Sequence, residues 1–361
     1  MDKPFVTSSP SIDDQHKTSL EFSSRSGVIL KTDDTGSVRI RQESSLDNDV
    51  EIKTTISCKL DFHDISGISI VSPTKAWIHN PQRLRLIDIE TGRIIRSFKT
   101  DIILRYVNAL SDTAILFLSS NEILRLNIND DQTCNFRTLL DVSEGDNERT
   151  QKKLNVFTVS PSGELYVCLT NQWACACFSG EFSSIERFSM DAKLLQKGKI
   201  RNKRNNVICN AYAIVVNSHG YICIAGEKFE RDGEVCVVIL DSQFRFRSFY
   251  DINTFIQEHI PSTLATDMND NFLVVHTFKD RVRPWDDPHW RAKKRQDITF
   301  VSVIDENGQF LFHPPIEEVP MNGIVKICTL DTSGKTWMIS DTGEIIISVF
   351  ERLAKRVEEE E

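Results

Sequence analysis

SPTKAWIHNPQRLRLIDIETG, at residues 72–92, joins a turn, an apolar strand, a second turn and an alternating strand. Its first part, SPTKAWIH at 72–79, recurs five more times in degenerate form. The copies read SDTAILFL at 111–118, SPSGELYV at 160–167, NSHGYICI at 217–224, MNDNFLVV at 268–275 and DTSGKTWM at 331–338. Anchors at Ala76, Ala114, Glu164, Tyr221, Phe272 and Lys335 give spacings of 38, 50, 57, 51 and 63 residues. Strand-rich repeats of this length predict a β-propeller.

Four strands surround each anchor, because apolar or alternating runs are separated by Gly, Asn, Asp and Ser. In the first unit they are 65–71, 75–79, 83–88 and 93–98. Turns between a third and a fourth strand recur as FSGEF at 178–182, LDSQF at 240–244 and IDENGQF at 304–310. The sequence therefore predicts an all-β chain that forms a six-bladed β-propeller. A pair of β-sandwiches is the alternative, but it gives no reason for six similar units.

The two ends of the repeat region predict how the ring closes. The last unit has three strands before the chain becomes charged, while the alternating segment VEIKTTISCKL at 50–60 is spare. We expect 50–60 to pair with 344–350 as the outer strand of the sixth blade, which leaves no open seam. The predicted domains are a disordered tail at 1–26, a hairpin or linker at 27–49, the propeller at 50–350 and a short charged tail at 351–361.

Composition and charge limit the function classes. The chain has 43 Lys and Arg against 52 Asp and Glu, and its net charge of −9 argues against a wholly basic nucleic-acid packaging protein. Its 9 Cys are irregularly spaced, and several lie in apolar runs, as reduced and buried thiols do. No apolar run is typical of a signal peptide or a membrane span. We therefore expect a cytoplasmic protein without membrane association.

Six units of this length, each with a turn and an apolar strand, resemble the NHL-type propellers at the C-terminus of tripartite-motif proteins. The stretch at 72–92 in particular resembles the first blade of the propellers of many invertebrate B-box proteins. The resemblance covers about residues 50–350 and implies a substrate-binding or RNA-binding module. This sequence contains no paired CxxC motifs followed by His, as RING and B-box zinc sites require, and no long heptad segment. Ubiquitin-ligase activity is therefore not carried over to it.

Two insertions are basic, and strand parity places both on the face that carries the long loops. The first contains Lys193, Lys197, Lys199, Arg201, Lys203 and Arg204, with no acid among them. The second contains Lys279, Arg281, Arg283, Arg291, Lys293, Lys294 and Arg295, together with Trp285 and Trp290. On the neighbouring fourth and fifth blades they are expected to form one positive patch for carboxylates or phosphates, with tryptophan stacking if bases are present. The alternative is a set of charged loops that are only solvated.

The favoured function is a non-catalytic interaction module that binds a protein partner through the long-loop face, without a cofactor or a metal. RNA binding through the basic patch is the second hypothesis. A calcium-dependent hydrolase is the third, since other propellers could carry carboxylates and amides around the inner-strand entrances. The aligned inner strands place there Gly67, Asn155, Tyr212, Thr263 and Lys326, with Asp64, Asn210 and Asn322 nearby. The aligned set holds one good calcium ligand and a lysine that would repel the cation.

Overall fold

The computed structural model describes sixteen segments of the chain. They are 28–32, 38–42, 50–59, 65–89, 91–129, 133–142, 150–175, 178–202, 205–229, 234–250, 259–267, 269–278, 299–312, 325–328, 335–340 and 344–352. All regular secondary structure in these segments is β-strand. They contain no helix with the length and hydropathy that a membrane crossing requires.

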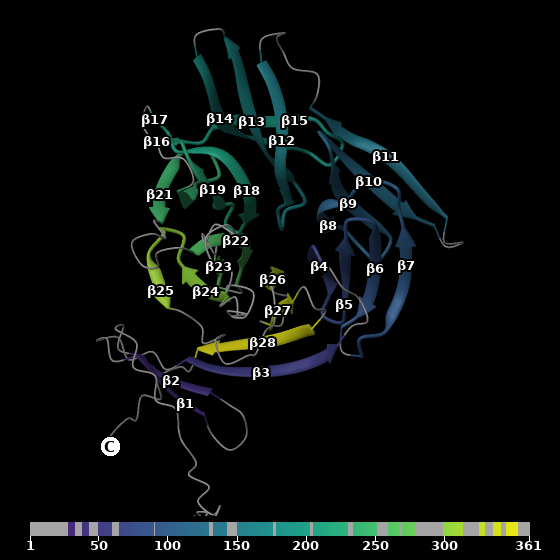
Figure 1. Cartoon of the computed structure of the whole chain (residues 1–361), viewed down its shortest axis with the longest axis vertical. Helices are drawn as coiled ribbons and strands as arrows, with labels where there is room; N and C mark the ends of the chain where they lie inside the picture. Colours follow the sequence, from purple (N-terminus) through teal and green to yellow (C-terminus); the bar gives the residue numbers. More distant parts are fainter. Residues whose placement is uncertain are drawn as a thin grey trace, which may run out of the picture.

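Five four-stranded antiparallel sheets stand around a common centre, which makes the fold a β-propeller (Figure 1). The first blade contains β4 (Gly67–Ser72), β5 (Lys75–Asn80), β6 (Arg83–Asp88) and β7 (Ile94–Lys99). The second contains β8 (Arg105–Ala109), β9 (Ala114–Ser119), β10 (Glu122–Ile128) and β11 (Cys134–Asp141). The third contains β12 (Thr150–Val159), β13 (Leu165–Cys175), β14 (Phe178–Phe188) and β15 (Leu194–Lys199).

The fourth blade contains β18 (Ile208–Val216), β19 (Ile222–Lys228), β20 (Val235–Leu240) and β21 (Phe246–Tyr250). The fifth contains β22 (His259–Thr266), β23 (Phe272–Phe278), β24 (Thr299–Ile304) and β25 (Phe310–Phe312). A two-stranded sheet of β16 (Arg201–Asn202) and β17 (Asn205–Asn206) connects the third blade to the fourth. In each blade the first strand lies nearest the centre, so β4, β8, β12, β18 and β22 surround it (Figure 1).

The prediction of six four-stranded blades is wrong, because the structure has five. The remaining sheet has six strands in the order β1-β2-β3-β28-β27-β26. Its strands are β1 (Val28–Thr32), β2 (Val38–Gln42), β3 (Val50–Lys59), β26 (Val325–Cys328), β27 (Lys335–Ser340) and β28 (Glu344–Arg352). The difference arises at the N-terminal end, where the β1–β2 hairpin adds to β3 through the pairs Val38↔Ile52 to Ile40↔Val50. An isolated hairpin is marginally stable in water, and pairing with β3 gives this one a sheet to extend.

The two ends of the chain meet in this six-stranded sheet. β28 pairs with β3 from Glu344↔Lys59 to Arg352↔Val50, so the predicted pairing of 50–60 with 344–350 is present. β26 lies beside β4 on one side and β22 on the other, which joins the sheet to the first and fifth blades. The predicted tail at 1–26 lies outside the described residues, and residues 351 and 352 of the predicted C-terminal tail belong to β28.

In the repeated turns, the side chain of a short polar residue accepts hydrogen bonds from backbone N–H groups of the same turn. Asp241 Oδ1 accepts the backbone N–H groups of Gln243 and Arg245, each at 2.9 Å. Asp267 and Asp305 make the same pair of bonds in the fifth blade, to the residues two and four positions later. Asp and Asn favour turns because of such bonds to their own backbone. Because one such side chain organises the turn, the other residues of the repeated motif can vary.

The core lies between adjacent blades. Trp77 and Leu86 of the first blade pack against Ile115 and Phe117 of the second, and all four side chains are buried. Corresponding clusters join the second blade to the third, the third to the fourth and the fourth to the fifth. A blade between two neighbours thus buries apolar side chains on both faces, which is why middle strands such as β9 and β20 are almost continuously apolar.

The third blade is longer than the prediction allowed. FSGEF at 178–182 was predicted to be a turn, but these residues lie inside β14, which pairs with β13 from Leu165↔Phe188 to Cys175↔Phe178. The turn before the fourth strand is instead at 189–193, where the Ser189 N–H donates to the Lys193 carbonyl at 2.9 Å. FSGEF at 178–182 and SMDAK at 189–193 both contain turn-forming residues, and the sequence alone could not decide between them.

Candidate binding site at the mouth of the central cavity

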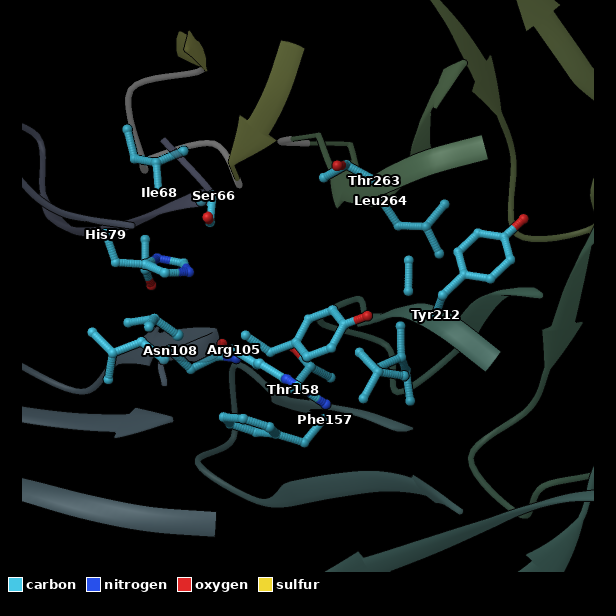
Figure 2. A pocket seen from close by; sticks show the side chains of 18 of the residues that line it. Ser66, Ile68, His79, Arg105, Asn108, Phe157, Thr158, Tyr212, Thr263 and Leu264 are labelled. Atoms are coloured by element: carbon cyan, nitrogen blue, oxygen red, sulfur yellow. The ribbon is translucent and has the colours of Figure 1, made fainter. Parts of the chain in front are cut away.

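A cavity of about 520 Å³ occupies the centre of the ring (Figure 2). Its wall is built by the beginning of β4 and β8 and the later parts of β12, β18 and β22, together with residues of β5 and of the segments before β4 and β8. Pro81, in the turn between β5 and β6, also lines it. Turns of that kind and the connections between blades share one face of a propeller blade. The cavity therefore opens on the face where the sequence places the long loops.

Four inner strands contain an extra residue near this end. The register against the second strand shifts at Tyr106 in β8, at Asn155 in β12, at Tyr212 in β18 and at Ser262 in β22. Such bulges bend a strand and turn a side chain in a new direction, and they are common at the rims of barrels and beside binding sites. Because four inner strands contain such a bulge, the strand pairing is irregular around the mouth of the cavity.

The bulge in β8 places Arg105 and Tyr106 at the mouth. Tyr106 has a φ of 42°, a left-handed conformation that is uncommon for a residue other than glycine and costs free energy. Tyr106 is 38% exposed and its neighbour Ile103 is 58% exposed, so this side of the wall faces solvent. The cavity walls nevertheless desolvate the Tyr106 hydroxyl, which raises its pKa, while the Arg105 charge lowers it. Arg105 and Tyr106 thus lie close enough for the Arg105 charge to act on the Tyr106 hydroxyl.

His79 reaches the cavity from the second strand of its blade. It pairs with Gly67 on β4, which has no side chain to fill the space between β5 and the cavity. Figure 2 shows the imidazole directed into the cavity next to Ser66, on the side opposite Tyr212. His79 is 3% exposed, so the protein encloses most of the ring.

The described lining mixes apolar and polar residues, and it carries positive charge. Arg105 is its one permanently charged residue, and among the described residues no carboxylate lines the cavity or forms an ion pair with Arg105. Ser66, Asn108 and Thr158 add hydroxyl and amide groups around it (Figure 2). A guanidinium surrounded by neutral hydrogen-bonding groups favours an anion, because it offers up to five donors in a planar fork.

The residues of the calcium hypothesis are only partly brought together. Gly67, Tyr212 and Thr263 line the cavity, as the alignment of inner strands predicts. The Asn155 side chain instead donates to the Thr170 hydroxyl, which donates in turn to the Cys209 carbonyl of the fourth blade at 3.1 Å. This chain of hydrogen bonds joins two blades, and Asn155 is not among the residues that line the cavity.

The remaining residues of that hypothesis do not form a described site. Asp64 and Asn322 lie outside the described residues, and so does the side chain of Lys326. Asn210 belongs to β18 beside a second register shift. Across the described segments, no three His, Cys, Asp or Glu side chains lie together in the way that metal ligands do.

The first half of the predicted basic patch is not a loop. Lys197 and Lys199 lie on the outer strand β15, Lys193 precedes that strand and Arg201 begins β16, and all four are exposed. Lys197 forms an ion pair of 3.2 Å with the buried carboxylate of Glu186. The segment is a strand because, after the turn at 189–193, it pairs with β14 from Phe188↔Leu194 to Ser184↔Lys199.

The other residues of the predicted basic patch belong to segments that the structure does not describe. Lys203 and Arg204 lie outside the described residues, as do Lys279, Arg281, Arg283, Arg291, Lys293, Lys294 and Arg295. Trp285 and Trp290 belong to the same undescribed segment at 279–298. One continuous patch therefore stays a prediction.

Sequence reasoning missed Arg105, Tyr106 and His79. The alignment of inner strands used a fixed register, and the extra residue at Tyr106 makes that register fail in β8. For His79, nothing in the sequence shows that its cross-strand partner is Gly67. A glycine opposite a histidine in a repeated strand pair was the one available signal.

No protein-family profile and no curated protein sequence matches the chain. Several solved structures are similar in fold. The β-propeller domain of Cps50 (Swd1) from Myceliophteria thermophila is 11% identical, with 94% of this chain and 97% of that chain covered and a TM-score of 0.53. A luciferin-regenerating enzyme is 10% identical over 84% of this chain and 97% of that chain, with a TM-score of 0.53. A gluconolactonase from Xanthomonas campestris is 11% identical over 84% and 90%, with a TM-score of 0.51.

These similarities show the propeller fold and nothing narrower. They include a domain of a larger protein as well as enzymes, so they do not support the prediction that the chain lacks catalytic activity. They do not single out the NHL type either. A shared propeller hosts unrelated functions, and the function must be argued from the site. The chain is a β-propeller protein whose central cavity presents an arginine.

Proposed function

We propose that this propeller is a protein-interaction module that holds an acidic group of its partner at the mouth of the central cavity. The observation that carries the proposal is Arg105, a guanidinium with no described carboxylate partner, placed by a strained bulge at the edge of the cavity. Strain of this kind persists where the surrounding structure maintains it, often at ligand sites. An interaction module of this kind would resemble the substrate-binding propellers of tripartite-motif proteins.

The size and chemistry of the cavity suit one side chain or a chain terminus. A volume of about 520 Å³ lies within the usual range of ligand sites, of about 300–1,000 Å³. Arg105 would bind a carboxylate through two parallel N–H···O bonds, the geometry that arginine provides and lysine does not. Ser66, Asn108 and Thr158 would complete the hydrogen bonds of a polar group that enters further.

Binding is better supported than catalysis by the same lining. The described wall offers no carboxylate or thiol nucleophile and no carboxylate that would orient a base, so His79 beside the Ser66 hydroxyl is its one candidate base–nucleophile pair. A general base needs a neighbour that orients it and a nucleophile within hydrogen-bond reach. Recognition of an anion requires only the positive charge and the neutral donors already described.

An array of immobilised peptides tests the proposal. The peptides differ at one central position, which is Glu, Gln or Lys, and the purified chain is the probe. Glu peptides should be retained most, and Arg105→Gln should abolish that preference. Arg93→Gln is the matched control, since Arg93 is an exposed arginine in the turn before β7, far from the cavity. Equal retention of Glu and Gln peptides, or an Arg105→Gln variant that keeps the preference, would refute the proposal.

RNA binding and calcium-dependent hydrolysis stay as separate predictions. RNA binding should fall steeply with salt, because each neutralised phosphate of a single strand adds about 0.7 to the logarithmic slope. It should also weaken in Trp290→Ala by about 1–3 kcal/mol if bases stack on that ring. Calorimetric titration with Ca²⁺ tests the hydrolase hypothesis, which requires a heat of binding that Asn155→Ala and Asn210→Ala reduce.

A further inference from the structure

The hairpin of β13 and β14 extends beyond its neighbours in the third blade. These two strands pair over their whole length, up to Cys175↔Phe178. β15 pairs with β14 only from Ser184↔Lys199 to Phe188↔Leu194. Figure 1 shows the strands of this blade projecting from the ring. The first part of β14, from Phe178 to Ser183, therefore continues past the end of its outer neighbour.

That part of β14 has an open edge with a defined hydrogen-bonding parity. The Ser183 carbonyl accepts the Ile200 N–H at 3.2 Å, so the backbone groups of Ser183 point to the outer side. In a strand, successive residues alternate between the two sides. The N–H and C=O groups of Ser179 and Glu181 consequently face the same outer side, where no described strand pairs with them.

The chain turns away from this edge immediately afterwards. β16 and β17 pair with each other there, and the Val207 N–H returns to the Ile200 carbonyl at 3.1 Å. A strand added along Phe178–Phe182 would lie in line with β15 and would complete a four-stranded sheet toward the tip of the hairpin. The fifth blade has a step of the same kind among its described residues, because β25 pairs with β24 only at Val303 and Ile304.

The near end of the open edge is positively charged. Lys199 is the residue of β15 paired with Ser184, and Arg201 follows two positions later. Both are exposed, and the sequence from Ala192 to Asn202 contains no acid. An extended segment that enters the edge with acidic residues would meet these two charges.

We propose that the free edge of β14 at Phe178–Phe182 binds an extended acidic segment of a protein partner by strand addition, with Lys199 and Arg201 beside its end. Main-chain hydrogen bonds give such complexes their affinity, and side chains select the sequence. This surface is separate from the central cavity, so the partner need not be the one that Arg105 binds.

The experiment uses the full chain and a fluorescent peptide of about eight residues with alternating Glu and Thr, which favours an extended strand. Fluorescence anisotropy should show binding of this peptide. A peptide with a central Thr replaced by Pro keeps the charge but loses a backbone donor and should bind about tenfold more weakly. A peptide of alternating Lys and Thr should not bind.

Variants of the chain locate the surface. Lys199→Ser combined with Arg201→Ser should weaken the Glu-Thr peptide about tenfold, as expected for the loss of two charge-assisted contacts. Lys193→Ser is the matched control, because it removes an exposed lysine at the opposite end of β15 and should leave affinity unchanged. Glu181→Pro removes an outward N–H and should weaken binding to a similar degree.

Hydrogen exchange of the unaltered chain decides the case even if Glu181→Pro does not fold. The peptide should slow amide exchange of Ser179 and Glu181, whereas Arg105→Gln should not alter this protection. Equal affinity for the Pro-containing peptide, or protection elsewhere in the chain, would overturn strand addition. A uridine oligonucleotide that displaces the peptide and protects only the lysine side of β15 would show that the surface binds nucleic acid instead.

Discussion

A β-carbon on Gly67 would lie 2.5 Å from Cε1 of the His79 imidazole, so this histidine occupies the cavity wall because the inner strand has no side chain there. The two residues are cross-strand partners. The shape of the cavity therefore depends on Gly67, which has no side chain that could form a hydrogen bond to a ligand.

Gly67→Ala should therefore displace His79 and reduce both stability and peptide binding. Overpacking of a filled site costs about 1–3 kcal/mol of unfolding free energy, which urea denaturation measures. Gly163→Ala is the control, because its added carbon would meet no atom within 4 Å and only the φ of 80° would be strained. The control should lose stability without losing the preference for Glu peptides. Full binding by Gly67→Ala would show that His79 has no part in the site.

Arg105→Gln should remove acidic-peptide binding with little effect on stability. The residue is exposed and has no described ion pair, and surface substitutions of this kind change the free energy of unfolding by about 0.5 kcal/mol or less. Arg105→Lys should restore only part of the binding, because an ammonium cannot form the two parallel bonds of a guanidinium. Thermal melts and the peptide array measure the two effects separately. A Lys variant with full affinity would indicate simple charge attraction.

Closure of the ring depends on β3. Deletion of residues 1–59 removes the strand that pairs with β28, and the exposed edge should lower the melting temperature and promote aggregation. Deletion of residues 1–26 is the control and should leave the melting temperature unchanged, since the sequence predicts a tail there. Differential scanning calorimetry compares the two. A chain without 1–59 that melts at the same temperature would show that β3 does not hold the ring together.

The sequence predicted the propeller because its turns carry their own chemistry. Asp241 and Asp267 organise a turn with bonds to nearby backbone, so the pattern is local and can be read without tertiary information. The count of blades was wrong because the β1–β2 hairpin joins β3 through long-range pairing that no local pattern specifies. Register shifts likewise depend on interactions that no local sequence pattern specifies. The bulge at Tyr106 depends on the packing around β8, and for this reason the mouth of the cavity was not predictable.

Tyr212 and Tyr250 have different hydroxyl environments, so removal of each hydroxyl should have a different effect on the free energy of unfolding. The Tyr212 hydroxyl is buried without a hydrogen-bond partner among the described residues, and burial raises its pKa. Tyr250 donates to the Ser302 hydroxyl at 3.4 Å, which lies 2.9 Å from His276 Nε2. Tyr212→Phe should be neutral or stabilising, whereas Tyr250→Phe should cost about 1 kcal/mol. Urea denaturation of both variants checks the order, and a larger loss for Tyr212→Phe would reveal a partner for that hydroxyl.

Two aspartates in equivalent turns should respond to pH in opposite ways. The pKa of Asp241 is lowered: although burial opposes ionisation, its bonds to the Arg245 and Gln243 backbone N–H groups and to the Arg245 side chain prevail. The pKa of Asp267 is raised, because burial outweighs its bonds to Asn271 and Asn269. A lowered pKa contributes stability that is present above the unfolded pKa and is lost as the pH falls through the folded value. A raised pKa has the reverse effect, so ionised Asp267 opposes folding at neutral pH and the loss is recovered as the pH falls.

The Asn variants separate these two contributions, since an amide keeps an oxygen acceptor for the turn. Asp241→Asn should destabilise the protein at about pH 7 by about 0.5 kcal/mol, the scale of an ion pair with a mostly exposed arginine, and the difference should shrink below about pH 4. Asp267→Asn should cost less at about pH 7 or increase stability, and its difference from the unaltered chain should also shrink as the pH falls. Urea denaturation at both pH values measures the four differences. A larger loss for Asp267→Asn at neutral pH would mean that its carboxylate is solvated and that the two turns are electrostatically alike.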